Sequence, residues 1–180
     1  PALQRSLPAD LSAARDLIAL AQRPLVIVGL DLVHQGGAVA LDRFLARTGA
    51  PLLTTYKAKG LVPEGDRRVI GGLGLSPRAD AIIRPLIDAA DLIVLAGYDP
   101  IEMRQGWRNP WPADKPVIDI VAETVMHGMH TSSLLLEGDV GTILTRLADG
   151  HKPVAVWPEG EPVRVRERFR AAFASPVEWG

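Results

Sequence analysis

The chain has 180 residues, and its 20 basic and 21 acidic residues leave a formal charge of −1, so electrostatics gives no reason to expect a nucleic-acid or membrane partner. Cysteine is absent, which excludes disulfides, a thiolate nucleophile and sulfur-ligated metals. There is no apolar run of about 18 residues and no signal-like start, so we expect a cytoplasmic protein whose core fits one large domain.

Five short apolar runs, each followed by a glycine, an acid or a threonine, dominate the pattern. They occupy residues 25–28, 52–53, 92–96, 117–118 and 134–136. Runs without polar alternation are buried on both faces, as in a parallel sheet covered by helices on each side. We therefore expect a Rossmann-like three-layer α/β/α sandwich, with any ligand at the carboxyl ends of the strands.

Helical periodicity and glycine or proline punctuation place helices between these strands. Asp10 can cap a first helix over 10–22, and Gly49 can end a crossover helix over 36–48. The other expected elements are strands over 24–28, 51–55, 69–73, 92–96, 116–121 and 133–136 and helices over 79–90 and 140–148. The pattern thus predicts a six-stranded parallel sheet.

Two segments depart from this alternation. Residues 100–114 hold Trp107 and Trp111 among prolines, cannot form one regular helix, and could form an apolar contact surface toward another domain. The end of the chain changes in composition, so we divide it into a domain over 1–150 and a linker with a helix over 151–180 that leads toward a missing C-terminal domain. The alternative is an ordinary C-terminal helix folded back on the sheet.

Sequence motifs for familiar chemistry are missing. The turn after the first strand, residues 29–37, lacks the G-x-G-x-x-G spacing of dinucleotide-binding proteins, and no P-loop or G-x-S-x-G nucleophile turn is present. A glycine at position 29 could allow the strand to pack tightly on the following helix, or it could allow a cofactor to approach the backbone closely. We expect no catalytic residue in this chain.

Charged side chains nevertheless gather just after the strands. Lys57 and Lys59 could meet phosphates or a carboxylate, or could be solvated loop residues. Asp99, Glu102 and Asp119 could hold a ribose hydroxyl or a cation, or could cap helices.

Two of the four histidines, His127 and His130, are three residues apart. Such spacing can bring two imidazoles to one metal ion, but Gly128 between them weakens a regular helix. We expect no metal site.

The order of motifs along the chain carries a resemblance. The segments are RPLVIVG ending at Gly29, TTYKAKG from Thr54 to Gly60, GGLG ending at Gly74, ADLIVLAGYD ending at Asp99, Ile118 with Asp119, and EGD ending at Asp139. In this order they resemble the central domain of thiamine-diphosphate-dependent enzymes, of the acetolactate synthase and 2-keto acid decarboxylase family. The resemblance covers about residues 10 to 148.

This resemblance implies a sheet of the DHS-like NAD/FAD-binding type, set between an N-terminal and a C-terminal domain that this chain lacks. The family holds thiamine diphosphate and Mg²⁺ through those other domains, and its members form homodimers or homotetramers mainly through them. The Gly-Asp-Gly motif that holds the diphosphate is absent here. The resemblance thus implies a domain that does not catalyse alone, in a parent acting on a 2-keto acid.

The central domain of this family binds FAD in some members, ADP in others and no nucleotide in the rest. Matching by motif gives candidate cofactor-binding residues after successive strands: Gly29, Leu30, Thr55, Tyr56, Lys57, Gly74, Gly97, Tyr98, Asp119 and Ile120. Lys57 and Lys59 could hold ADP or CoA. Asp31 and Asp99 count against FAD, because each places a carboxylate where flavin-binding members have a glycine or an arginine.

Two alternatives stay open beside the resemblance. A stand-alone Rossmann-like sensor module would use the same strand-end cleft to bind a nucleotide. An NAD-dependent deacetylase shares the sheet type, but its paired glycine-alanine loop and its catalytic histidine have no counterpart here.

Overall fold

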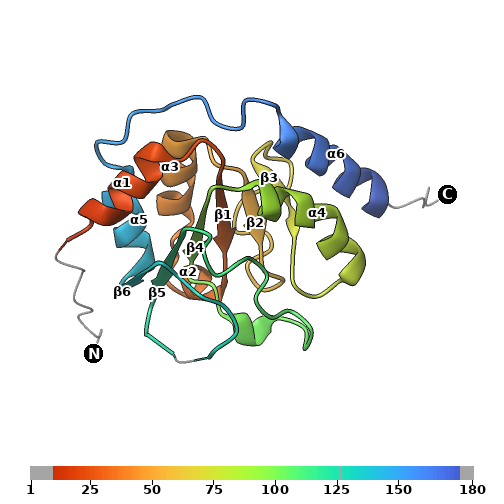
Figure 1. The fold of residues 1–180 in the computed structure, drawn as a ribbon, viewed down its shortest axis with the longest axis horizontal. Coiled ribbons are helices and arrows are strands. Elements are labelled where there is room, and N and C mark those ends of the chain that lie inside the picture. Colours follow the sequence, from red (N-terminus) through yellow and green to blue (C-terminus); the bar gives the residue numbers. More distant parts are fainter. Residues whose placement is uncertain (1–9, 126, 175–180) are drawn as a thin grey trace.

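Six parallel strands form the centre of the structure, a computed structural model that describes residues 10–125 and 127–174 (Figure 1). Their order across the sheet is β3-β2-β1-β4-β5-β6. The strands are β1 (Pro24–Val28), β2 (Leu52–Thr54), β3 (Val69–Gly72), β4 (Leu92–Ala96), β5 (Val117–Val121) and β6 (Leu134–Glu137). The six-stranded parallel sheet predicted from the apolar runs is confirmed.

Helices cover both faces of this sheet. One face packs on α1 (Ser12–Leu20), α3 (Ala38–Thr48) and α5 (Val140–Ala148), and the other on α4 (Pro77–Ala89) and α6 (Glu161–Phe173). Alternate residues of each strand enter opposite cores: Val26 and Val28 face α3, whereas Leu25 and Ile27 face α4. Because both sets are fully buried, the apolar runs show no polar alternation. No helix of the described residues is long and apolar enough to cross a membrane.

The helix boundaries follow local capping. Ser76 Oγ accepts a hydrogen bond from Ala79 N at the start of α4, and Asp139 Oδ1 accepts one from Thr142 N at the start of α5. Gly49 ends α3 at φ 68°, as predicted. Asp10 accepts from Ser12 N, so it supports the start of α1.

The sequence did not predict a short helix, α2 (Leu30–His34), directly after β1. It fills most of the turn that was expected to be a loop, and α3 therefore begins at Ala38 rather than at residue 36. Five residues are too few to show a helical period.

The expectation of an apolar contact surface at the tryptophan-rich segment is wrong. After a 3₁₀ turn, η1 (Pro100–Glu102), the loop folds back, so that Trp107 and Trp111 are only 2% and 3% exposed. Both rings belong to the core under α4. Burial is tolerated because each indole N–H has a partner: Trp107 Nε1 donates to Tyr98 Oη and Trp111 Nε1 to the Thr131 carbonyl.

The tail, residues 149–174, runs from α5 back to β1 and then forms α6 against β3 and α4. Trp157 is buried and donates from Nε1 to the Pro24 carbonyl at 2.8 Å. Helix α6 then lies along α4 and β3, with the Phe169 ring over Gly71, where a Cβ would lie 2.5 Å from the ring. The structure thus shows a C-terminal helix folded back on the sheet, which was the alternative expected from the sequence. The division of the chain at residue 150 and the link to a further domain stay predictions.

Asp66 provides a pH-dependent contribution to stability before β3. Hydrogen bonds from Arg68 lower the pKa of Asp66 from 3.8 to about 2, and Arg68 also pairs with Asp42 of α3 at 2.6 Å. A lowered native pKa means that this contribution is present above pH 4 and is lost as the pH falls toward 2. We expect Asp66→Asn to lower the free energy of unfolding at pH 7 by about 1 kcal/mol and to have little effect near pH 2, measured by urea denaturation. An equal loss at both pH values would contradict the role of the carboxylate charge.

Candidate functional site

The strand order places the topological switch point between β1 and β4, where Gly29 and Gly97 follow neighbouring strands. Ligands of doubly wound sheets bind in the crevice outside such a point. Here the two turns touch: a Cβ on Gly29 would lie 2.3 Å from the Gly97 carbonyl oxygen, and one on Gly97 would lie 2.6 Å from Leu32 N. Gly29 and Gly97 therefore serve tight backbone packing between the two turns.

A buried carboxylate, that of Glu102, lies beside the first residue of α2. Glu102 faces the N–H of Leu30 at the start of α2 and the hydroxyl of Thr55, with Lys57 nearby, and these groups lower its pKa. Burial has the larger effect, so the pKa of Glu102 is raised overall. Both carboxylate oxygens are buried, and neither has a partner at full hydrogen-bond geometry. Glu102 was predicted only as a ribose, cation or capping group, because its distance from α2 depends on the fold.

The basic loop after β2 points outward. Tyr56, Lys57 and Lys59 are exposed, and Lys59 Nζ pairs with Glu64 at 3.1 Å. Thr55 is fully buried and accepts a hydrogen bond from Ala58 N, which shapes the turn. Lys57 and Lys59 are thus solvent-exposed loop residues in this structure, which is one of the two alternatives that the sequence left open.

Gly74 is held by structural contacts. Its φ is 87°, its N–H donates to Asp80 Oδ1 at 2.7 Å, and a Cβ would meet the Met103 sulfur at 2.0 Å. Asp80 in turn pairs with Arg104 at 3.0 Å. These contacts tie the β3–α4 turn to the loop after η1.

Two separate pockets lie near the carboxyl ends of the strands. One, of about 670 Å³, lies between the end of β2, the β3–α4 turn and α6; Thr55, Tyr56 and Lys59 line it together with Phe169 and Arg170. The other, of about 530 Å³, lies beside β4 and β5, where Tyr98 and Asp119 line it. The predicted cofactor residues are therefore divided between two pockets, and Gly29, Leu30, Lys57, Gly74, Gly97 and Ile120 line neither.

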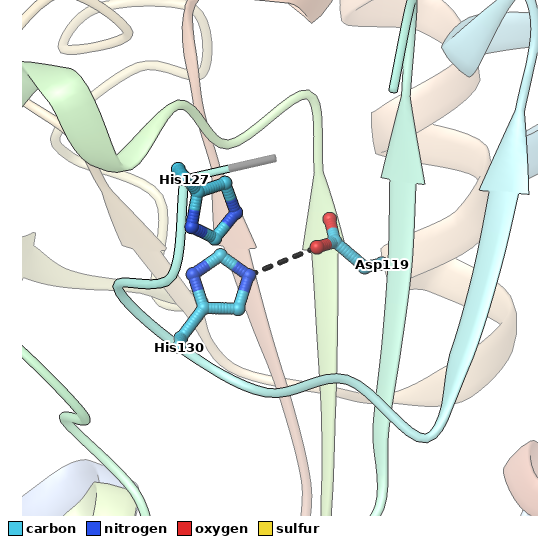
Figure 2. A group of neighbouring side chains, drawn as sticks. All are labelled: Asp119, His127 and His130. Atoms are coloured by element: carbon cyan, nitrogen blue, oxygen red, sulfur yellow. Dashed lines mark hydrogen bonds and ion pairs between the residues drawn. The ribbon is translucent and has the colours of Figure 1, made fainter. Parts of the chain in front are cut away.

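The second pocket contains a buried polar cluster (Figure 2). His130 Nε2 lies 2.9 Å from Asp119 Oδ2, and both side chains are almost fully buried, at 2% and 5% exposure. The His127 ring lies over that of His130, with ring centroids 4.4 Å apart. The pKa of His127 is lowered, mainly by burial and then by His130. Tyr98 closes the cluster, and burial raises the pKa of its hydroxyl.

The sequence analysis selected the members of this cluster one by one, but it did not predict that they lie close together. Asp119 was selected as a strand-end acid, and His127 and His130 for their spacing. Ile120, selected beside Asp119, points to the opposite core, and only its carbonyl, which accepts from Gly97 N, lies at this edge. Successive side chains of a strand point to opposite faces of the sheet, so this rule could have placed Asp119 and Ile120 on opposite faces from the sequence alone.

The fold defines a doubly wound, Rossmann-like α/β domain. The profile described as "Thiamine pyrophosphate enzyme, central domain" matches residues 11–147, so the chain belongs to this family. The resemblance stated from the motifs is confirmed.

Individual relatives agree with this assignment. The chain is 29% identical over 177 residues to AruI of Pseudomonas aeruginosa, named a probable 2-ketoarginine decarboxylase, with 91% of this chain and 29% of AruI covered. It is 26% identical over 140 residues to acetolactate synthase isozyme 2 large subunit of Escherichia coli, covering 77% of this chain and 25% of that subunit. An X-ray structure from Mycobacterium smegmatis, assigned as a thiamin diphosphate-dependent enzyme, superposes with a TM-score of 0.70 at 22% identity, covering 86% of this chain and 30% of the other. The chain thus spans less than a third of the length of these proteins.

Proposed function

We propose that this chain is the central, non-catalytic domain of a thiamine-diphosphate-dependent enzyme that decarboxylates a 2-keto acid or joins two of them. The family match over residues 11–147 carries this proposal. The names of the relatives, a 2-ketoarginine decarboxylase and acetolactate synthases, support the substrate class. Thiamine diphosphate would supply the electron sink for decarboxylation when bound to other domains, together with Mg²⁺.

The contribution of this domain is a rigid framework. The strand-end turns at Gly29 and Gly97 are engaged in backbone packing. The missing N- and C-terminal domains are its expected partners, and assembly as a homodimer or homotetramer belongs to the same proposal. A stand-alone nucleotide sensor is the disfavoured alternative.

We further propose that the cleft holds no FAD. The residues do not fit its pyrophosphate, because the Gly29 and Gly97 turns touch and the Glu102 carboxylate, which lies by Leu30 N, would repel phosphates. Any ADP or CoA would bind weakly through Lys57 and Lys59, and Lys59 lines the 670 Å³ pocket.

The test uses the native protein, purified and given thiamine diphosphate and Mg²⁺. We expect carbon dioxide release from 2-keto acids, with pyruvate and 2-ketoarginine as the first two substrates, and no release when thiamine diphosphate is omitted. Absence of thiamine diphosphate binding would overturn the enzyme proposal.

Flavin is tested separately on the same preparation. We expect no flavin absorption and no heat of binding on titration with FAD. Retained or stoichiometric FAD would overturn the flavin proposal and leave the thiamine proposal intact.

A further inference from the structure

The second pocket has the charge of a cation site. Four carboxylates line it, from Asp31, Asp99, Asp119 and Glu123, and no lysine or arginine is among its lining residues. Such a surface repels the phosphates of a nucleotide and attracts a positive ion. The pocket therefore differs from the 670 Å³ pocket, which Lys59 and Arg170 line.

Three side chains in this pocket offer ligand atoms close together. One atom from each of Asp119, His127 and His130 lies within 4.8 Å of the others. The separation of 2.9 Å between His130 Nε2 and Asp119 Oδ2 is a hydrogen-bond distance. Two ligands of one tetrahedral ion lie about 3.3–3.6 Å apart when the metal–ligand distances are about 2.0–2.2 Å, so the pair must open by about 0.5 Å to bind an ion. The strand β5 fixes Asp119, and the rings of Tyr98 and Trp111 pack against His130.

The cluster leaves two buried polar atoms unsatisfied within the described part of the chain. Asp119 Oδ1 and His130 Nδ1 are buried and have no hydrogen-bond partner among the described residues. The Asp119 side chain is 5% exposed, and a buried carboxylate oxygen without a donor is costly. A bound cation would compensate the charge that the fold leaves unsatisfied.

The donor set selects the class of ion. Two imidazole nitrogens and one carboxylate oxygen suit Zn²⁺ and similar transition metals, whereas Mg²⁺ and Ca²⁺ prefer oxygen ligands. Three protein ligands leave a fourth position open toward the pocket.

Binding breaks two hydrogen bonds. The proton between His130 Nε2 and Asp119 Oδ2 must leave if both of these atoms bind the ion. His127 Nδ1 accepts a hydrogen bond from Met129 N at 3.0 Å. Coordination through either ring nitrogen breaks that bond, because Nδ1 must then carry the metal or the proton. Gly128, between the two histidines' backbones, has nothing within 4 Å of a hypothetical Cβ, so the local backbone has room to adjust.

We propose that Asp119, His127 and His130 bind a divalent transition metal of the Zn²⁺ type in the pocket beside β4 and β5. The site is separate from the Mg²⁺ expected with thiamine diphosphate, and it does not depend on the activity proposed above. The sequence alone favoured no metal here, because Asp119 joins the histidines only through the fold.

The test is calorimetric titration of the chelator-treated native protein with Zn²⁺, in excess Mg²⁺ so that the thiamine site does not contribute. We expect saturable binding of one Zn²⁺ per chain. His127→Ala should weaken it about a hundredfold or more, and Asp119→Asn should do the same without changing side-chain shape. The matched control is His34→Ala, which removes an exposed histidine outside the pocket and should leave the affinity unchanged.

A visible Co²⁺ absorption spectrum provides a second readout on the same variants. The spectrum of a tetrahedral site with nitrogen ligands should appear in the unsubstituted protein and in His34→Ala, and be lost in His127→Ala. Absence of saturable Zn²⁺ binding, or equal affinity in His127→Ala and the unsubstituted protein, would overturn the proposal.

Discussion

Gly97→Ala should lower the free energy of unfolding of the 180-residue chain by about 3–4 kcal/mol. Gly97 has φ 66°, and an added Cβ would lie 2.6 Å from Leu32 N and 2.8 Å from Asp31 Cβ. The positive φ costs about 1–2 kcal/mol in any L-residue. The rest comes from overpacking, because the obstructing Leu32 N is backbone of α2 and cannot rotate away.

Gly36→Ala is the matched control for this change. Gly36 has φ 67°, nearly that of Gly97, but nothing lies within 4 Å of its hypothetical Cβ. Gly36→Ala should therefore lower the free energy of unfolding only by about 1–2 kcal/mol, which is what the positive φ costs. Urea denaturation of both variants thus separates backbone strain from steric crowding. Equal losses in the two variants would mean that the Gly97 turn does not pack closely against α2.

The partner turn gives a second comparison without backbone strain. Gly29 has extended φ and ψ, and a Cβ would lie 2.3 Å from the Gly97 carbonyl oxygen, whereas one on Gly65 meets nothing within 4 Å. Gly29→Ala should therefore destabilise by about 2–3 kcal/mol and Gly65→Ala by little.

Trp157→Ala should cost about 3–5 kcal/mol, the range for removing a buried tryptophan. Trp157 is 5% exposed and packs in the core beneath α4, and its backbone N–H donates to the Gln22 carbonyl at 2.8 Å. It is the anchor of the tail before α6. We also expect faster limited proteolysis between α5 and α6, because the loop loses its attachment to β1.

Trp157→Phe separates packing from the hydrogen bond. It keeps an aromatic ring but leaves the Pro24 carbonyl without the Nε1 donor, so about 1–2 kcal/mol should be lost. If Trp157→Ala were no more destabilising than Trp157→Phe, the tail would be attached by α6 alone, through Val165 and Phe169.

Most strands could be predicted because burial on both faces leaves a local signal. The run over 92–96 predicts β4 (Leu92–Ala96) to the residue, and Gly49 marks the end of α3. Helix α2 was missed, since five residues between two glycine-containing turns carry no period. The burial of Trp107 and Trp111 was also missed, because their partners, Tyr98 and the Thr131 carbonyl, lie elsewhere in the fold.

The same distinction holds for the site. Each strand-end residue could be selected from the sequence, since parallel strands end at one edge. The division of those residues between two pockets, the position of Glu102 by Leu30 N and the meeting of Asp119 with His130 depend on how loops cross that edge.

By itself, the sequence determined the sheet, its helices other than α2 and the family, because buried periodicity and motif order are properties of local chain segments. Only the tertiary structure decided that the turns of Gly29 and Gly97 pack against each other and that an acidic pocket with two histidines lies beside them. The physical reason is that backbone contacts such as that of Gly29 with Gly97, and ligand clusters such as Asp119 with His130, join residues that no local pattern relates.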